Sequence, residues 1–296
     1  MRCLERVLTK GIMLIPVQDN NLKTIVLCYI PLCKNTVAPE PFPAYRTPRN
    51  MESEHEYANL ARKPYYDLKW HFPIRQLENH RVKLVPWASD LHAEPFYEGV
   101  RYHPSVFDNI PDGPFTSAQD VKSLIDRWVN PKMGMAVFAT LDISKSGSPL
   151  TGIIALRAAS AANLGFELVA LTLPAYQRQN MTAHAVGLIL QYAFAPTPVG
   201  LGIRRVFCHT AIRAMDDIRN SPTVRLAEKI GFSREGVVRW HYTYPPGRSG
   251  MPGESEDHRA RARHAVLLSI CWDDWENGGK KRVASLLQAA ETSARL

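Results

Sequence analysis

The chain has 296 residues, which is enough for one large domain or two small ones with a substantial core. Hydrophobic residues make up 45% and charged residues 22% of it, which are ordinary values for a globular protein. The net charge of +8 favours an anionic partner such as nucleic acid, acidic lipid or a phosphorylated cofactor, without choosing among them. The five cysteines are odd in number and form no CxxC pair, which argues against a zinc site or a disulfide framework and favours a reducing compartment.

The N-terminal region shows weak signals of structure. Its most apolar run, residues 24–33, has ten residues, whereas a membrane span needs about 20. Residues 35–50 are rich in proline and indicate a linker or arm. The basic start of the chain has only a short apolar part, interrupted by Pro16, so we expect a cytoplasmic protein without a membrane partner, with a mitochondrial location as the alternative. We expect residues 1–75 to form a weakly structured arm and linker.

Compact sequence begins near Arg81, where apolar runs start to predict strands and helices. The predicted strands cover residues 81–87, 135–142, 150–160, 165–173, 204–212, 235–244 and 264–272. The predicted helices cover residues 115–129, 182–194 and 222–230, with a further helix in the tail, 279–296. Three successive strands in the middle of the chain argue for antiparallel pairing and against a doubly wound sheet. We therefore expect one mixed α/β domain over residues 76–278, with helices on both faces of its sheet.

One stretch has the residue types of an anion-binding site. Residues 168–215 contain no aspartate or glutamate in 48 positions, although first turns of helices usually recruit acids. The helix predicted from residue 182 begins instead with Gln177, Arg178, Gln179, Asn180 and Thr182. Free N–H groups at such a turn, with an arginine and no acid, favour a phosphate or pyrophosphate. The alternative is that buried segments are poor in charge anyway and that Arg178 is simply solvated.

Several separated motifs resemble the GNAT superfamily of acetyl-CoA-dependent N-acetyltransferases, and in particular its branch with a P-x-x-Q-R strand-to-helix turn. They are PAYQR, IPDGPFTS, NSPTVRLAEKIGFSREGVVR and HAVLLSICWDDW, in the order of the family and within residues 81–275. The resemblance implies an α/β fold of the α+β kind, with a mixed, splayed sheet flanked by helices on both faces. It implies transfer of an acetyl group from acetyl-CoA to a primary amine by direct attack.

The resemblance also implies where coenzyme A binds. The two strands that splay apart in the family would be residues 165–173 and 204–212, with the pantetheine arm between them and the pyrophosphate on the N–H groups of residues 178–182. The asparagine at the head of the following helix contacts coenzyme A in the family, and a plain helix cap is the alternative role for it here. The cofactor-binding residues carried over in this way are Leu171, Leu173, Gln177, Arg178, Gln179, Asn180, Met181, Thr182, Asn220 and Thr223. We expect no metal.

Candidate bases for the attacking amine are few. An alkyl ammonium has a pKa near ~10, so a base is useful at neutral pH. Glu167 is the first choice because it is the only carboxylate on the central strand, and an exposed strand residue is its alternative reading. His209 on the next strand is the second choice, with a structural role as its alternative. Tyr242 and Tyr244 are candidates to protonate the leaving thiolate, or only to pack.

The chain departs from the family pattern at four places. The spacing from Gly165 to Pro174 is shorter than is usual in the P-x-x-Q-R branch, so Glu167 need not occupy the family's glutamate position. Asn180 and Thr182 stand where the general GNAT signature has glycines, and the tyrosine that many GNAT enzymes use as a general acid falls near Ala227. The connection over residues 245–263 is enlarged. These departures keep a second hypothesis open, a catalytically weak acyl-CoA-binding module. A third, an RNA-associated basic protein, has no nucleic-acid motif to support it.

We expect a small-molecule amine or a protein N-terminus as the acceptor, no nucleic-acid partner, and a monomer or a homodimer.

Overall fold

The computed structural model describes residues 12–16, 25–29, 72–129, 134–212, 221–244 and 262–293. The chain divides into two units, Met1–Asn50 and Met51–Leu296. In the first unit, strands β1 (Ile12–Pro16) and β2 (Ile25–Tyr29) form an antiparallel pair. The proline-rich stretch 35–50 and the enlarged connection 245–263 lie almost wholly outside the described residues. The expected domain limits at residues 75 and 278 stay a prediction.

The second unit is built on one eight-stranded sheet, in the order β3-β4-β5-β6-β7-β8-β10-β9. The strands are β3 (Leu77–Glu78), β4 (Val82–Pro86), β5 (Ala136–Asp142), β6 (Leu150–Ser160), β7 (Gly165–Thr172), β8 (Arg205–Ile212), β9 (Ser233–Thr243) and β10 (Ala262–Cys271). The pair β7–β8 is parallel, whereas every other neighbouring pair in this sheet is antiparallel. The expected mixed sheet is confirmed.

Helices connect these strands and follow the last one. They are α2 (Ser89–Val100), α3 (Ala118–Trp128), α4 (Met181–Phe194), α5 (Pro222–Ile230), α6 (Trp272–Asp274) and α7 (Lys280–Ser293), with short helices η1 (Pro104–Phe107), η2 (Pro174–Tyr176) and η5 (Trp275–Gly279). Helix α2 was not among the predicted helices, because it contains Pro95 in its interior and proline ordinarily ends a helix. None of the helices in the described part of the chain is long and apolar enough to cross a membrane.

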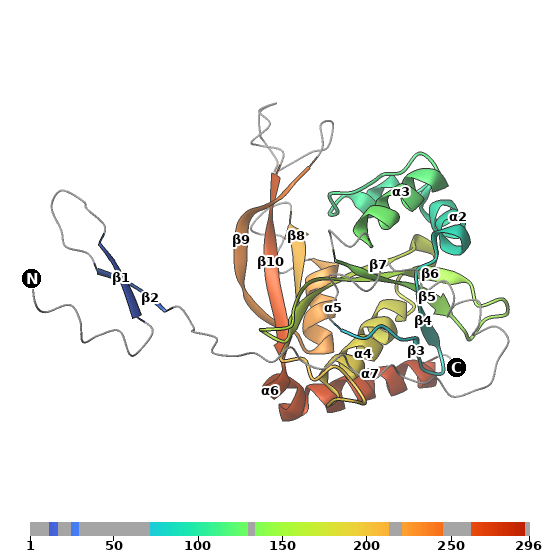
Figure 1. Ribbon diagram of the computed structural model, residues 1–296. Helices are drawn as coiled ribbons and strands as arrows, with labels where there is room; N and C mark the ends of the chain where they lie inside the picture. Colours follow the sequence, from blue (N-terminus) through green and yellow to red (C-terminus); the bar gives the residue numbers. More distant parts are fainter. Residues whose placement is uncertain are drawn as a thin grey trace, which may run out of the picture. The chain divides into compact units, whose positions relative to one another are not determined.

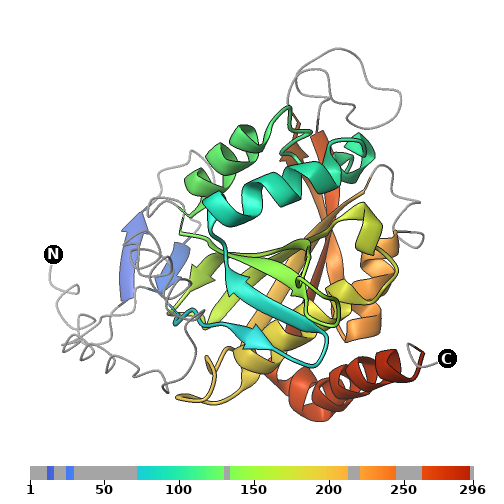
Figure 2. The ribbon, with the colours of Figure 1, turned by 90° about the vertical axis from the view of Figure 1, so that its right-hand side faces the viewer.

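The central strands of the sheet are buried on both faces, which explains why they are continuously apolar. Helices α2 and α3 cover one face, and α4, α5 and α7 cover the other (Figures 1 and 2). Successive residues of a strand contribute to opposite cores: Val137 packs on the α2–α3 face and Phe138 on the α4 face. The expected helices on both faces of the sheet are therefore confirmed.

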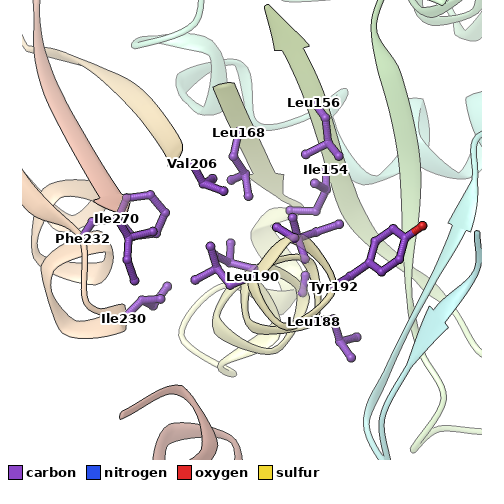
Figure 3. Packing of buried hydrophobic residues seen from close by; sticks show 14 of the residues in the cluster. Ile154, Leu156, Leu168, Leu188, Leu190, Tyr192, Val206, Ile230, Phe232 and Ile270 are labelled. Carbon is purple, nitrogen blue, oxygen red and sulfur yellow. The ribbon is translucent and has the colours of Figure 1, made fainter. Parts of the chain in front are cut away.

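Helix α4 lies at the centre of the larger core (Figure 3). Leu190 on this helix is fully buried in the same cluster as Leu168 of β7 and Val206 of β8. On its far side the helix packs against α7, where Gly187 allows close approach: a Cβ at this position would lie 3.2 Å from Val283 Cγ1. Contact with both the sheet and α7 explains why α4 is apolar nearly all round.

The parallel strands β7 and β8 diverge after a short pairing. They pair at Gly165–Arg205, Phe166–Val206 and Glu167–Phe207, and no further pair joins them along their described length. Beyond that point β7 keeps its partner β6 as far as Thr172, and β8 keeps its partner β10 as far as Ile212. We call this divergence the fork. It is the splay that the resemblance implied.

Gly152 of β6 allows close approach to β7, one of the two strands of the fork. This residue of β6 pairs with Thr172, and a Cβ at Gly152 would lie 2.2 Å from the backbone oxygen of Leu171. Since backbone atoms of a central strand cannot move aside as a side chain can, Gly152→Ala is expected to lower the free energy of unfolding by about 3 kcal/mol.

Urea denaturation measures this loss. Gly236→Ala on the edge strand β9 is the matched control, because a Cβ there meets nothing within 4 Å, and it should change stability by less than about 0.5 kcal/mol. Equal stability of the two variants would contradict the close approach.

Candidate active site

The closed end of the fork holds a buried carboxylate. Glu167 of β7 is only 6% exposed and sits at the last β7–β8 pair. Its neighbours Phe166 and Leu168 pack on the α4 face, whereas Val169 and Leu171 pack on the α2–α3 face. Because side chains alternate along a strand, Glu167 lies on the α2–α3 face. By the same alternation His209 of β8 lies on that face too, opposite to Cys208, which packs against the α4 core.

Both oxygens of Glu167 are hydrogen-bonded. The guanidinium of Arg157, on the neighbouring strand β6, donates from Nε to Oε2 at 2.9 Å and from Nη2 to Oε1 at 2.8 Å. His209 Nδ1 lies 3.0 Å from Oε1. An ionised carboxylate only accepts hydrogen bonds, so His209 carries its proton on Nδ1, which leaves Nε2 as the basic nitrogen of the ring.

These partners decide the charge of Glu167. Burial alone would raise its pKa, but the hydrogen bonds from His209 and Arg157, together with their charges, lower the pKa to about 2. Glu167 is therefore ionised at neutral pH and is a weak base there. Its geometry suits it to hold the His209 ring in one orientation and one tautomer.

Two residues of the edge strand β9 complete the group around His209. The His241 ring stacks on the His209 ring, with 4.2 Å between centroids and an interplanar angle of 21°. Burial and the neighbouring His209 lower the pKa of His241, which favours the neutral form of the His241 ring. The Tyr242 hydroxyl lies 3.5 Å from Arg157 Nη2 and 3.4 Å from the backbone oxygen of His209, and burial raises the pKa of Tyr242 to about 12.

The thiol nearest the fork is protonated. Cys208 precedes His209 on β8, and burial, reinforced by the charge of Glu167, raises the pKa of Cys208 to about 12. A thiol becomes a nucleophile only as the thiolate. Cys208 therefore acts as a small apolar group that packs against the core.

The turn between β7 and α4 has an unusual backbone. Arg178 and Asn180 both have positive φ angles, 62° and 61°. Asparagine tolerates this left-handed region better than most residues, which explains how it occupies a position where the family has glycine. Gln177 and Gln179 donate side-chain hydrogen bonds to backbone oxygens of Thr172 and Ala175 and so brace the turn.

The start of α4 presents free donors. No side chain caps the helix at Asn180, and its first turn contains no acidic residue. Its first N–H groups therefore lack partners within the helix, and the helix dipole favours an anion beside them. Thr182, at the second expected glycine position, ties the helix to β7 through a 2.5 Å hydrogen bond with Thr172. The Arg178 side chain is exposed beside this turn.

The other expected cofactor residues are placed differently. The side chains of Leu171, Leu173 and Met181 are buried in the two cores, and the Leu173 N–H donates to Thr151 O at 2.8 Å. Because their side chains are buried, these three residues could bind a ligand only through backbone groups, and the N–H of Leu173 is already hydrogen-bonded to Thr151 O. Thr223 is exposed in the first turn of α5.

Asn220 lies outside the described residues. The cap of α5 is Ser221, whose hydroxyl accepts from the Val224 N–H. The capping role that competes with cofactor binding for Asn220 is thus filled by its neighbour.

Sequence reasoning did not find Arg157 or His241. Arg157 pairs directly with Glu167 across the β6–β7 hairpin, but a register shift between Arg157 and Ser160 hides this pairing in the sequence. His241 follows Trp240, whose φ of 54° marks a bulge in β9. An arginine opposite a buried strand glutamate is a usable signal only when the hairpin register is known.

Comparisons with known proteins point to one family. A model of the acetyltransferase (GNAT) domain matches residues 81–233. A GCN5-related N-acetyltransferase from Brucella melitensis is 21% identical, with a TM-score of 0.58 over 72% of this chain and 86% of its own. A GNAT-family protein from Chromobacterium violaceum is 20% identical, with a TM-score of 0.56 over 69% and 89%. A protein from T. thermophilus described as an acetyltransferase is 22% identical, with a TM-score of 0.57 over 73% and 98%. No curated protein matches the chain.

The low pKa of Glu167 has a consequence for stability. Its folded pKa of about 2 lies below the ordinary glutamate value of 4.5, so its ion pairs stabilise the fold above about pH 4.5 and are lost as the pH falls toward 2. Glu167→Gln is expected to lower the free energy of unfolding at pH 7 by about 3 kcal/mol, since it also leaves Arg157 without its partner. The difference from the parent chain should shrink between pH 5 and pH 2.

Denaturant titrations at several pH values measure both effects. Glu94→Gln is the control, because Glu94 is an exposed carboxylate on α2, and it should change stability by less than about 0.5 kcal/mol. A Glu167→Gln variant with parental stability at pH 7 would show that the buried pair contributes nothing.

Proposed function

This chain belongs to the GNAT acetyltransferase family, and we propose that it transfers an acetyl group from acetyl-CoA to a primary amine by direct attack. The observation that carries the proposal is the fork, with the Glu167–His209 pair at its closed end and the uncapped start of α4 beyond its open end. The fork supplies unpaired backbone groups, the pair supplies a base, and the helix start supplies donors for an anion.

The residues present fit coenzyme A. Backbone groups of β7 and β8 beyond Glu167 and Phe207 have no partner across the fork, and pantetheine amides could pair with them. The N–H groups that begin α4, at Met181 and Thr182, together with Arg178, would hold the pyrophosphate. Gln177 and Gln179 would act by bracing the turn, and Asn220 and Thr223 at the head of α5 are further proposed contacts.

Acetyl-CoA would supply a thioester whose carbonyl carbon forms a bond with the amine nitrogen while the carbon–sulfur bond breaks. The proton of the attacking nitrogen needs an acceptor, and we assign this role to His209 Nε2. Glu167 is then a positioning residue, since its ionised carboxylate holds the Nδ1 proton and stabilises the imidazolium that forms. Of the two bases expected from the sequence, this geometry favours the second.

Cys208 supports direct attack. A covalent route needs a thiolate close to the acetyl group, whereas the Cys208 thiol has a pKa of about 12 and packs into the core away from His209. Tyr242, which keeps its proton to about pH 12, is a candidate donor to the leaving thiolate. The position near the tyrosine of many relatives holds Ala227, which is buried and has no donor.

Release of free thiol from acetyl-CoA in the presence of a panel of amines tests the reaction. A catalytically weak binding module would retain coenzyme A in calorimetry but release no thiol with any amine.

Cofactor binding at the start of α4 can be tested with one charge reversal. Arg178→Glu removes an exposed cation beside the uncapped helix start and adds repulsion, so affinity for coenzyme A should fall at least about tenfold. Arg239→Glu on the exposed edge strand β9 makes the same change of charge away from the turn and should leave the affinity within about twofold. Equal affinities of the two variants by calorimetry would refute the placement.

The base can be identified from pH–rate profiles. If His209 takes the proton, His209→Gln should reduce kcat/KM at pH 7 by about a hundredfold and remove the acid limb of the profile. The loss should shrink toward pH ~10, where the amine is already neutral. Glu167→Gln should keep an acid limb but shift it to lower pH, because the imidazolium loses its carboxylate partner.

The exposed His103 provides the control, and His103→Gln should retain the parental profile. A parental profile for His209→Gln, with activity abolished in Glu167→Gln, would return the role of base to Glu167.

A further inference from the structure

The loop that joins η1 to α3 is fastened beside the site. Arg263 of β10 is 3% exposed, and its Nη1 donates to the backbone oxygen of Asp108 and to Asn109 Oδ1. At the other end, Ser117 and Asp120 cap α3 reciprocally. Between them Gly113 has a φ of 77°, and a Cβ there would lie 2.6 Å from the Phe107 ring. The loop is thus held at both ends and pressed on the core in between.

Arg263, which fastens this loop, also connects it to the residues around Glu167 and His209. Arg263 is the cross-strand partner of Tyr242 in the β9–β10 register. Tyr242 in turn places its hydroxyl 3.5 Å from Arg157 Nη2, which bonds Glu167. The loop therefore lies on the same face as the Glu167–His209 pair, next to the strand that carries His241.

Asp112 of this loop differs from Glu167 in the partners of its carboxylate. Its side chain is half-buried, and no hydrogen bond or ion pair joins it to the part of the chain that the structure describes. Burial raises the pKa of Asp112, and the charges of Arg127 and Arg157 oppose this rise. Arg157, which bonds Glu167, is therefore one of the two cations whose charge acts on Asp112. A partly desolvated carboxylate without a donor gains most from a cation that a ligand brings.

We propose that Asp112 binds a second ammonium group of the acceptor, so that diamines are acetylated in preference to monoamines of the same length. The inference rests on the proposed acetylation of amines. The reacting nitrogen gives up a proton as it is acetylated, and His209 is already assigned to take it. A second, distant nitrogen stays charged throughout the reaction and can be held by Asp112.

Paired acceptors test the proposal. The rates of thiol release with α,ω-diamines of two to five carbons are compared with those of the matching n-alkylamines, in the parent chain and in Asp112→Asn. For the best diamine, Asp112→Asn should reduce kcat/KM by about tenfold or more, whereas the monoamine should change by less than about twofold. Asp112→Glu keeps the charge and should restore the preference, with a shift in the preferred chain length.

Asp273→Asn is the matched control. It removes one exposed carboxylate from α6, which follows the C-terminal end of β10, whereas Arg263 and the loop lie at the other end of this ten-residue strand. The two positions are therefore about 30 Å apart along the strand. The control should keep the parental preference for diamines.

Calorimetry separates this inference from the proposed function. Titration of 1,3-diaminopropane and of propylamine into the parent chain and Asp112→Asn, each with coenzyme A present, reports binding without turnover. Thiol release absent with every amine would overturn the proposed function, and a diamine affinity lost in Asp112→Asn would still support the binding role of Asp112. Turnover with equal preference in the parent chain and Asp112→Asn, or equal diamine affinity in both, would overturn the inference alone.

Discussion

The parting of β7 and β8 after Glu167 and Phe207 is the constraint on which the rest of the site depends. A buried backbone group without a partner is costly, so strands in the middle of a sheet separate only where something else can satisfy them. Here each strand keeps its outer neighbour over its whole length, which holds the opening at a defined width. The two hydrophobic cores press on both faces of the same strands and prevent the sheet from closing by a shift of register.

The charged group at the closed end of the fork is stable for a different reason. Removing a carboxylate and a guanidinium from water costs several kcal/mol for each ion, and only good geometry offsets this cost. Arg157 meets Glu167 with two parallel hydrogen bonds, and His209 takes a further position on the same carboxylate. The arrangement fixes three side chains from three neighbouring strands, so the orientation of the histidine ring is a property of the sheet and not of a mobile loop.

Much of the fold could be predicted from local sequence. The apolar runs of the central strands are confirmed because these strands are buried on both faces, and the boundaries of α5 follow from its Ser221 cap, Pro222 and Gly231. Helix α2 could not be predicted in the same way, because Pro95 in its interior opposes a helical reading and only packing of Phe96 and Val100 outweighs it.

The site was harder to predict from the sequence than the fold. Glu167 and His209 stood out as rare polar residues on apolar strands, but which face they occupy depends on register, and a slip of one residue reverses it. The pairing of Arg157 with Glu167 is set by an irregular hairpin whose residues Ala158 and Leu164 both have positive φ. No local rule predicts such a connection. Asp112 lies within the IPDGPFTS motif, but the motif assigns it no role, and its place beside the site follows from the anchoring of its loop by Arg263.

The turn before α4 differs from a glycine-rich phosphate loop in how it reaches its shape. Glycine visits the left-handed region easily but also visits many others, so a glycine loop must lose conformational freedom when a ligand arrives. Here Arg178 and Asn180 have left-handed φ angles although neither is glycine. Side-chain hydrogen bonds of Gln177, Gln179 and Thr182 join the turn and the start of α4 to the neighbouring chain. The conformational entropy of this turn is therefore lost during folding and not when a ligand binds. A ligand of this turn would therefore bind a pre-organised backbone and lose less conformational entropy than it would on a flexible glycine loop.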